Sequence, residues 1–157
     1  FGSAALSARL ASELARRSGT RAVSVDFALA PEHPYPAALH DAVAAYQALL
    51  DDGTPADDVV LVGESSGGGL ALATTLTIIA TGRPLPAAIY VASPWADLTT
   101  TGASMTTKAD VDPSVSPDGL RRRAGNYAPD HDLADEIASA PSSPTSRLAP
   151  PTDPGRR

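Results

Sequence analysis

One serine of this sequence lies in a pattern that could expose its hydroxyl group as a nucleophile. Ser65 follows an apolar, β-branched run at 58–62 and precedes an apolar stretch at 66–80, with Gly63 and Gly67 on either side of it. The run predicts a strand buried on both faces of a sheet, and the stretch predicts a helix. A tight turn between strand and helix crowds the residues two before and two after the serine, so both must be small. We therefore predict an exposed, strained turn with Ser65 at its tip.

The peptide groups after this serine could stabilise an oxyanion. A serine hydroxyl is a weak nucleophile, and it needs a nearby base and donors for the negative charge that develops. The first turn of a helix has free N–H groups and the positive end of the helix dipole, so we predict that the Ser66 N–H is one donor. The alternatives are a glycine-rich turn that only packs a helix on a strand, and a phosphate-binding turn. The phosphate-binding turn is disfavoured because no Lys-Ser or Lys-Thr pair follows the glycines.

The elements that would position this turn alternate along the chain between helices and strands. The periodicity of apolar residues predicts helices over about 3–17, 36–50 and 66–80, and strands over about 21–27, 58–62 and 87–92. This alternation favours an α/β fold with a parallel sheet and crossover helices. After Trp95 the pattern weakens, and residues 98–135 predict loops with one short helix near 117–126.

We expect a single partial α/β domain over residues 1–140 and an irregular, proline-rich tail over residues 141–157. The tail has five prolines and no periodicity, so it cannot supply the further parallel strand that the pattern requires. Eleven arginines against one lysine are typical of a GC-rich gene, which when read out of frame yields Pro, Ser, Arg and Thr. We interpret the tail as a frameshift or gene-prediction artefact. Because the chain also opens on Phe1, we expect a domain incomplete at both ends.

Composition and charge are typical of a globular protein and disfavour several classes of partner. Of 157 residues, 43% are hydrophobic and 19% charged, values that disfavour wholesale disorder. The net charge of −6 disfavours nucleic acid and anionic lipid, and the run at 121–123 is interpreted as a solvated helix face. The absence of cysteine excludes disulfides and favours a cytoplasmic location. The longest apolar run is too short for a membrane span and no signal peptide is visible, so we expect no membrane partner; oligomeric state is not predicted.

Three blocks of the sequence carry a more specific pattern. Residues 29–41 read LAPEHPYPAALHD, residues 63–68 read GESSGG and residues 93–98 read SPWADL. They resemble the L-A-P-E-H-P-x-P-A-A-x-x-D, G-D-S-A-G-G and S-P-W-x-D-L blocks of the hormone-sensitive-lipase-like esterases, also described as the α/β-hydrolase fold-3 group. The resemblance covers about residues 1–110, and its proline-rich block is highly specific.

This resemblance implies a partial α/β-hydrolase fold and a carboxylic ester hydrolase that acts on short-chain, small-molecule esters through an acyl-enzyme. It implies a Ser-Asp-His triad with no metal or organic cofactor. Ser65 corresponds to the nucleophile, the Ser66 N–H to an oxyanion donor, and Gly63 and Gly67 to the glycines of the nucleophile elbow. The family's H-G-G-G loop would lie before Phe1, and no segment here resembles the later acid and histidine motifs. The expectation is therefore an inactive fragment of a lipase-like carboxylesterase.

The sequence also permits other interpretations. Ser65, Asp97 and His131 have the chain order of a Ser-acid-His triad, although Asp97 matches a family position that is not the catalytic acid. His131 lies in an unpatterned loop, His33 is interpreted as a structural residue of the proline-rich turn, and His40 as a surface residue. The alternative functions are a non-catalytic small-molecule-binding module of the same fold, and an amidase or deacetylase.

Overall fold

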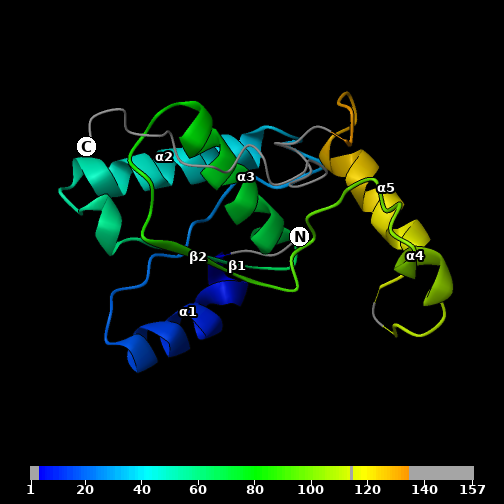
Figure 1. Ribbon diagram of the computed structural model, residues 1–157, viewed down its shortest axis with the longest axis horizontal. Coiled ribbons are helices and arrows are strands. Elements are labelled where there is room, and N and C mark those ends of the chain that lie inside the picture. The colour runs from blue at the N-terminus through cyan, green and yellow to red at the C-terminus, as the bar shows by residue number, and fades with distance from the viewer. Residues whose placement is uncertain (1–3, 114, 135–157) are drawn as a thin grey trace, which may run out of the picture.

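The computed structural model describes residues 4–113 and 115–134, in which two helices are followed by a strand, a helix and a second strand (Figure 1). The elements are α1 (Ala4–Ser18), α2 (Ala37–Asp51), a 3-10 turn η1 (Ala56–Asp58), β1 (Val60–Glu64), α3 (Ser66–Ala80), β2 (Ala88–Ala92), α4 (Ser104–Thr107) and α5 (Pro117–Tyr127). The helices predicted in the first half and the short helix near 117–126 are confirmed. The proline-rich tail lies outside the described residues.

The sheet is parallel and α3 is the crossover between its strands. In the described residues it has two strands, with Val60 paired with Ala88 and Glu64 with Ala92. Helix α3 packs against both strands, and α2 packs against α3. Figure 1 shows both helices on one side of the sheet and α1 on the other, so the predicted parallel sheet with a crossover helix is confirmed.

The prediction of a strand over residues 21–27 is wrong for the described structure. The segment has no strand assignment, and Val23 is 55% exposed. Its polar side chains bond back to the start of α1, since the Ala4 N–H donates to the Asp26 carboxylate (3.2 Å) and the Ser24 hydroxyl donates to the Ala4 carbonyl (3.4 Å). A strand forms only where a neighbouring strand pairs with its peptide groups, and among the described residues no segment does so.

Burial of β1 also differs from the prediction. Its apolar run was expected to be buried on both faces, yet Val60 is 51% and Val62 44% exposed, and Tyr90 of β2 is 60% exposed. The reason is that the described sheet has only two strands. Helices α3 and α2 lie over one face, and no third strand lies along either edge of the described sheet. Parallel sheets are stable when both faces are covered.

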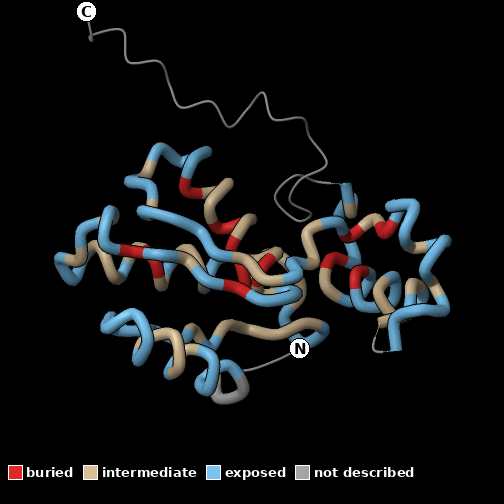
Figure 2. The backbone as a smooth tube through the Cα atoms, turned by 60° about the horizontal axis from the view of Figure 1, so that its bottom comes forward, coloured by how far each residue is buried: buried red, intermediate tan, exposed pale blue. Residues whose placement is uncertain are grey.

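Two hydrophobic clusters hold the fold together, and Figure 2 shows their buried segments in red. The first joins α2, α3 and the start of β1 through Tyr46, Val59 and Ile78. The Tyr46 hydroxyl in that cluster donates a hydrogen bond to the Pro84 carbonyl (2.8 Å). The second cluster, which we call the aromatic cluster, has Leu98 and Ala124 at its centre with Tyr35, Trp95, Tyr127 and Leu133 around them. It ties the proline-rich turn to α5.

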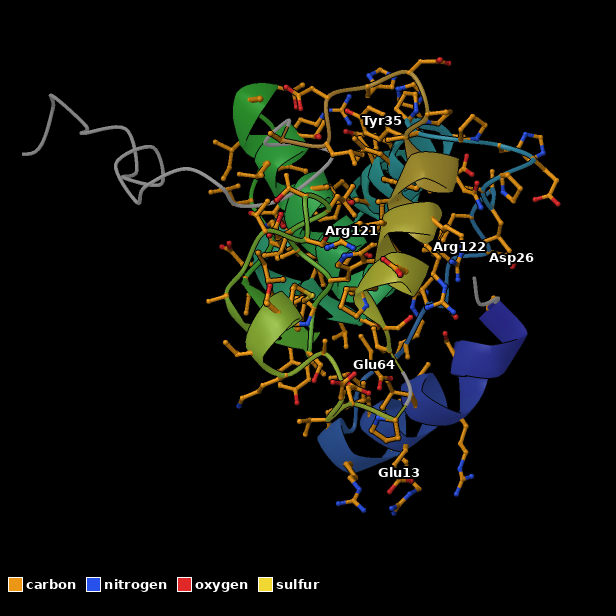
Figure 3. The ribbon with its side chains drawn as sticks, turned by 90° about the vertical axis from the view of Figure 1, so that its right-hand side faces the viewer. Glu13, Asp26, Tyr35, Glu64, Arg121 and Arg122 are labelled. Carbon is orange, nitrogen blue, oxygen red and sulfur yellow. The ribbon has the colours of Figure 1, made fainter. Side chains whose placement is uncertain are left out.

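Helices α4 and α5, with the loops around them, form a lobe beyond the carboxyl ends of β1 and β2 (Figure 1). We call residues 104–113 and 115–134 the α4–α5 lobe. The Ser116 hydroxyl caps α5 by accepting the Gly119 N–H (3.1 Å). Arg121 and Arg122 point outward from α5 (Figure 3), and the run at 121–123 is exposed as predicted. Helix α4 was not predicted.

Candidate active site

Ser65 lies at the carboxyl end of β1, in the turn that leads into α3. Its backbone angles are φ 53° and ψ −121°, and its side chain is exposed. A positive φ is uncommon for a residue other than glycine, so the backbone is strained at this serine. The structure thus has the exposed, strained turn that the glycine pattern predicts.

The two glycines of this turn have different roles. A Cβ atom at Gly63 would lie 2.2 Å from the carbonyl oxygen of Gly67, a distance that no packed structure tolerates. A Cβ atom at Gly67 would have no atom within 4 Å. The expectation that both positions require glycine is therefore wrong for Gly67, because only the Cβ of residue 63 would point across the turn.

Two further glycines are required, and sequence reasoning missed them. A Cβ atom at Gly68 would lie 2.9 Å from the Pro94 Cβ, and one at Gly69 would lie 2.3 Å from the Trp95 carbonyl oxygen. The start of α3 therefore lies directly against the loop after β2. The signal in the sequence was the unbroken run of three glycines, since glycine in a helix costs about 1 kcal/mol relative to alanine and so indicates a close approach.

Backbone hydrogen bonds hold Ser65 from both sides. Its N–H donates to the Ala92 carbonyl (3.0 Å), and its carbonyl accepts the Trp95 N–H (2.8 Å). The same carbonyl accepts the N–H groups of Gly68 (3.0 Å) and Gly69 (3.2 Å), which starts the helix. The turn at Ser65 is thus bonded to the residues that end β2 and follow it.

The N–H of Ser66 lies at the start of α3. Among the described residues no acceptor takes this N–H, as expected at the first turn of a helix. It lies at the positive end of the α3 dipole, beside the Ser65 hydroxyl in sequence. Such a group can donate a hydrogen bond to an oxyanion that forms when the serine attacks a carbonyl carbon.

The structure does not bring Asp97 and His131 together with the serine. The Asp97 carboxylate accepts the Thr99 N–H (2.8 Å) and the Thr99 hydroxyl (2.5 Å), so it caps its own turn. The His131 ring packs edge-on against the Tyr35 ring, with centroids 4.8 Å apart. In residues 4–113 and 115–134, no hydrogen bond or ion pair joins either residue to Ser65.

The other two histidines, His33 and His40, lie in the proline-rich turn and on α2. His33 is exposed and its N–H closes the proline-rich turn on the Leu29 carbonyl (2.9 Å). His40 is exposed on α2. The part of the chain that the structure describes contains no group of three metal-ligating side chains. Nor do the described helices include one with the length and apolar character that crossing a membrane requires.

Comparison with known proteins identifies the family. A family model described as the alpha/beta hydrolase fold matches residues 1–152. The chain belongs to the α/β-hydrolase family. Among curated proteins, this α/β-hydrolase is 42% identical over 130 residues to an acetyl-hydrolase of Streptomyces hygroscopicus, covering 83% of the chain and 44% of that protein. It is 31% identical over 134 residues to human hormone-sensitive lipase, covering 79% of the chain and 12% of that protein.

Solved structures give the same family. This α/β-hydrolase superposes with a TM-score of 0.85 on an esterase of the bacterial hormone-sensitive lipase family, at 40% identity. The match covers 88% of the chain and 47% of that structure. The resemblance to hormone-sensitive-lipase-like esterases is thereby confirmed, and the chain spans less than half the length of the relatives that it matches.

Proposed function

We propose that the protein hydrolyses carboxylic esters and that Ser65 is its nucleophile. The observation that supports this proposal is the strained turn that exposes Ser65 next to a free N–H at the start of α3. Strain of this kind persists where the surrounding structure enforces it, and it clusters at functional sites. Relatives named esterase and acetyl-hydrolase support the same reaction class.

The proposed reaction has two stages. The Ser65 hydroxyl oxygen attacks the carbonyl carbon of the ester while a base removes its proton, and the Ser66 N–H donates to the oxyanion of the tetrahedral intermediate. Collapse of that intermediate breaks the ester bond while the base returns the proton to the leaving oxygen, which releases the alcohol and leaves the acyl group on Ser65. Water then attacks the acyl-enzyme, and the acid is released with the serine restored.

We propose short-chain, small-molecule esters as substrates, which the name of the Streptomyces relative supports. We also propose that the 157-residue chain by itself has little turnover, because none of its described histidines bonds to Ser65. Members of a triad act as a unit, so loss of the base removes most of the rate enhancement. The base and the remaining oxyanion donors would then come from parts of the protein beyond this chain.

A chimera tests the nucleophile. The 130 matched residues of this chain replace the corresponding part of the Streptomyces acetyl-hydrolase, and hydrolysis of p-nitrophenyl acetate is followed. We expect activity that Ser65→Ala lowers by about 10⁴-fold or more, whereas Ser66→Ala retains most of it because its N–H remains. A chimera in which Ser65→Ala is as active as the parent would refute the assignment.

The isolated chain tests the second part of the proposal. We expect it to hydrolyse p-nitrophenyl acetate at the rate of its own Ser65→Ala variant. Activity of the isolated chain that is lost in Ser65→Ala and in His131→Ala would show that the base lies within this chain.

A further inference from the structure

The loop that follows β2 is strained next to the nucleophile turn. Within the described residues, three non-glycine residues have positive φ: Ser65 (53°), Ser93 (44°) and Thr100 (54°). The first is the candidate nucleophile, and the other two lie in residues 93–103, which we call the β2 loop. Left-handed backbone at a serine and a β-branched threonine is unfavourable, so the surrounding contacts must hold it. Contacts between the turn and the β2 loop would stabilise the strained backbone of both segments.

Trp95 makes the contacts that join the β2 loop to the turn. Its N–H donates to the Ser65 carbonyl (2.8 Å), and its own carbonyl oxygen lies so close to α3 that only glycine fits at position 69. With the Ser65 N–H bonded to the Ala92 carbonyl, both peptide groups of the strained serine are bonded to residues 92–95. The Trp95 N–H thus makes one of the two hydrogen bonds that join the backbone of Ser65 to residues 92–95.

The side chain of Trp95 contacts a different part of the molecule from its peptide group. Its indole N–H donates to the Asp97 carbonyl (3.1 Å), and its ring packs in the aromatic cluster with Leu98 and Ala124. Tyr35 belongs to the same cluster, and its N–H donates to the Tyr127 carbonyl (2.6 Å) at the end of α5. Figure 3 shows Tyr35 near that end of α5. One residue therefore links the α4–α5 lobe and the proline-rich turn to the nucleophile turn.

We propose that Trp95 is a positioning residue for Ser65. Its ring, anchored in the aromatic cluster, fixes the peptide group that holds the Ser65 carbonyl, and packing of the α4–α5 lobe sets the geometry of the nucleophile turn. The catalytic meaning of this coupling rests on the proposed function of Ser65. The coupling itself is a property of the fold, and it can be measured without any substrate.

Amide hydrogen exchange of the full chain, followed by NMR, tests the coupling. The N–H groups of Gly68 and Gly69 report on the turn, and the amides of α2 report on global stability. We expect Trp95→Ala to speed exchange at the two glycines about tenfold more than in α2, because loss of the anchor frees the turn to open locally. Trp95→Phe, which keeps an aromatic ring, should restore protection to within about twofold.

Three further variants separate positioning from general destabilisation. Ile78→Ala removes a buried side chain from the other cluster and should speed exchange in the turn and in α2 by the same factor. Tyr35→Ala should act like a weaker Trp95→Ala, since it loosens the aromatic cluster. Ser65→Ala should leave the pattern unchanged, which makes this readout independent of the nucleophile assignment.

Each result of these experiments either supports the positioning role of Trp95 or overturns it. If Trp95→Ala does not fold, Trp95→Leu replaces it, with an expected selective effect of about fivefold. Equal acceleration in the turn and in α2, or an unchanged turn, would overturn the proposal. In the active chimera, Trp95→Ala should lower kcat about tenfold with little change in KM, whereas an inactive chimera would count against the proposed function alone.

Discussion

Substitution of alanine for each of the two glycines that flank Ser65 should change the free energy of unfolding in opposite directions. In Gly63→Ala the new Cβ would lie 2.2 Å from the Gly67 carbonyl oxygen, which is fixed in the backbone of α3. The strand and the helix must then separate by about 1 Å to restore a normal contact. Because overpacking of this kind distorts backbone and not a flexible side chain, we expect a loss of about 3 kcal/mol in the free energy of unfolding.

Gly67→Ala is the matched control for that substitution. Its Cβ would meet nothing within 4 Å, and residue 67 lies in the first turn of α3 with ordinary helical φ. Alanine loses less backbone entropy than glycine on folding, so we expect a gain of about 0.5 kcal/mol.

Urea unfolding measures both values. Trp95, the one tryptophan of the sequence, provides the fluorescence signal next to the turn, and far-ultraviolet circular dichroism provides an independent one. Equal stability of Gly63→Ala and the parent chain, or a loss above about 1 kcal/mol in Gly67→Ala, would refute the steric account of the turn.

Two other predictions concern pH and association. Burial, with Tyr35 beside it, raises the pKa of Tyr127 from 10.0 to about 12. The unfolded chain therefore ionises first, and stability should fall by about 2–3 kcal/mol as pH rises from 10 to 12. In urea titrations, Tyr127→Phe should remove most of this dependence of stability on pH. An unchanged dependence would show that another group causes it, for example Tyr46, because burial also raises the pKa of Tyr46. Separately, the exposed apolar sheet should make the chain associate, and Val62→Lys should lower its sedimentation-equilibrium mass. Val111→Lys, at a 72% exposed residue of the lobe, is the control, and an equal effect of both would show that the sheet is not the interface.

The strained turn at Ser65 could be predicted from the sequence because its signal is local. A β-branched run, a serine between glycines and an apolar helix lie in one short stretch, and β1, α3 and the strain at Ser65 all follow from it. The parallel sheet followed from the same local periodicities, since a strand, a helix and a strand in series favour a right-handed crossover.

The parts that could not be predicted depend on contacts between distant segments. The strand expected at 21–27 had the correct alternation of residues. A strand forms only when a neighbouring strand pairs with its peptide groups, and none pairs with this segment in the described structure. The need for glycine at 68 and 69 arises from Pro94 and Trp95, which are about 25 residues away along the chain. The aromatic cluster likewise joins Tyr35 to α5 across most of the sequence, and no periodicity records such a pair.

The close approach of α3 to the β2 loop has a consequence for protein engineering. Residues 68 and 69 leave no volume for a side chain while Pro94 and Trp95 stay in place, so neither stretch can be redesigned by itself. A transplant of the serine turn into another scaffold would have to bring residues 92–95 with it as a second, discontinuous insert. The transferable unit is therefore a two-part module that the recipient must hold in register.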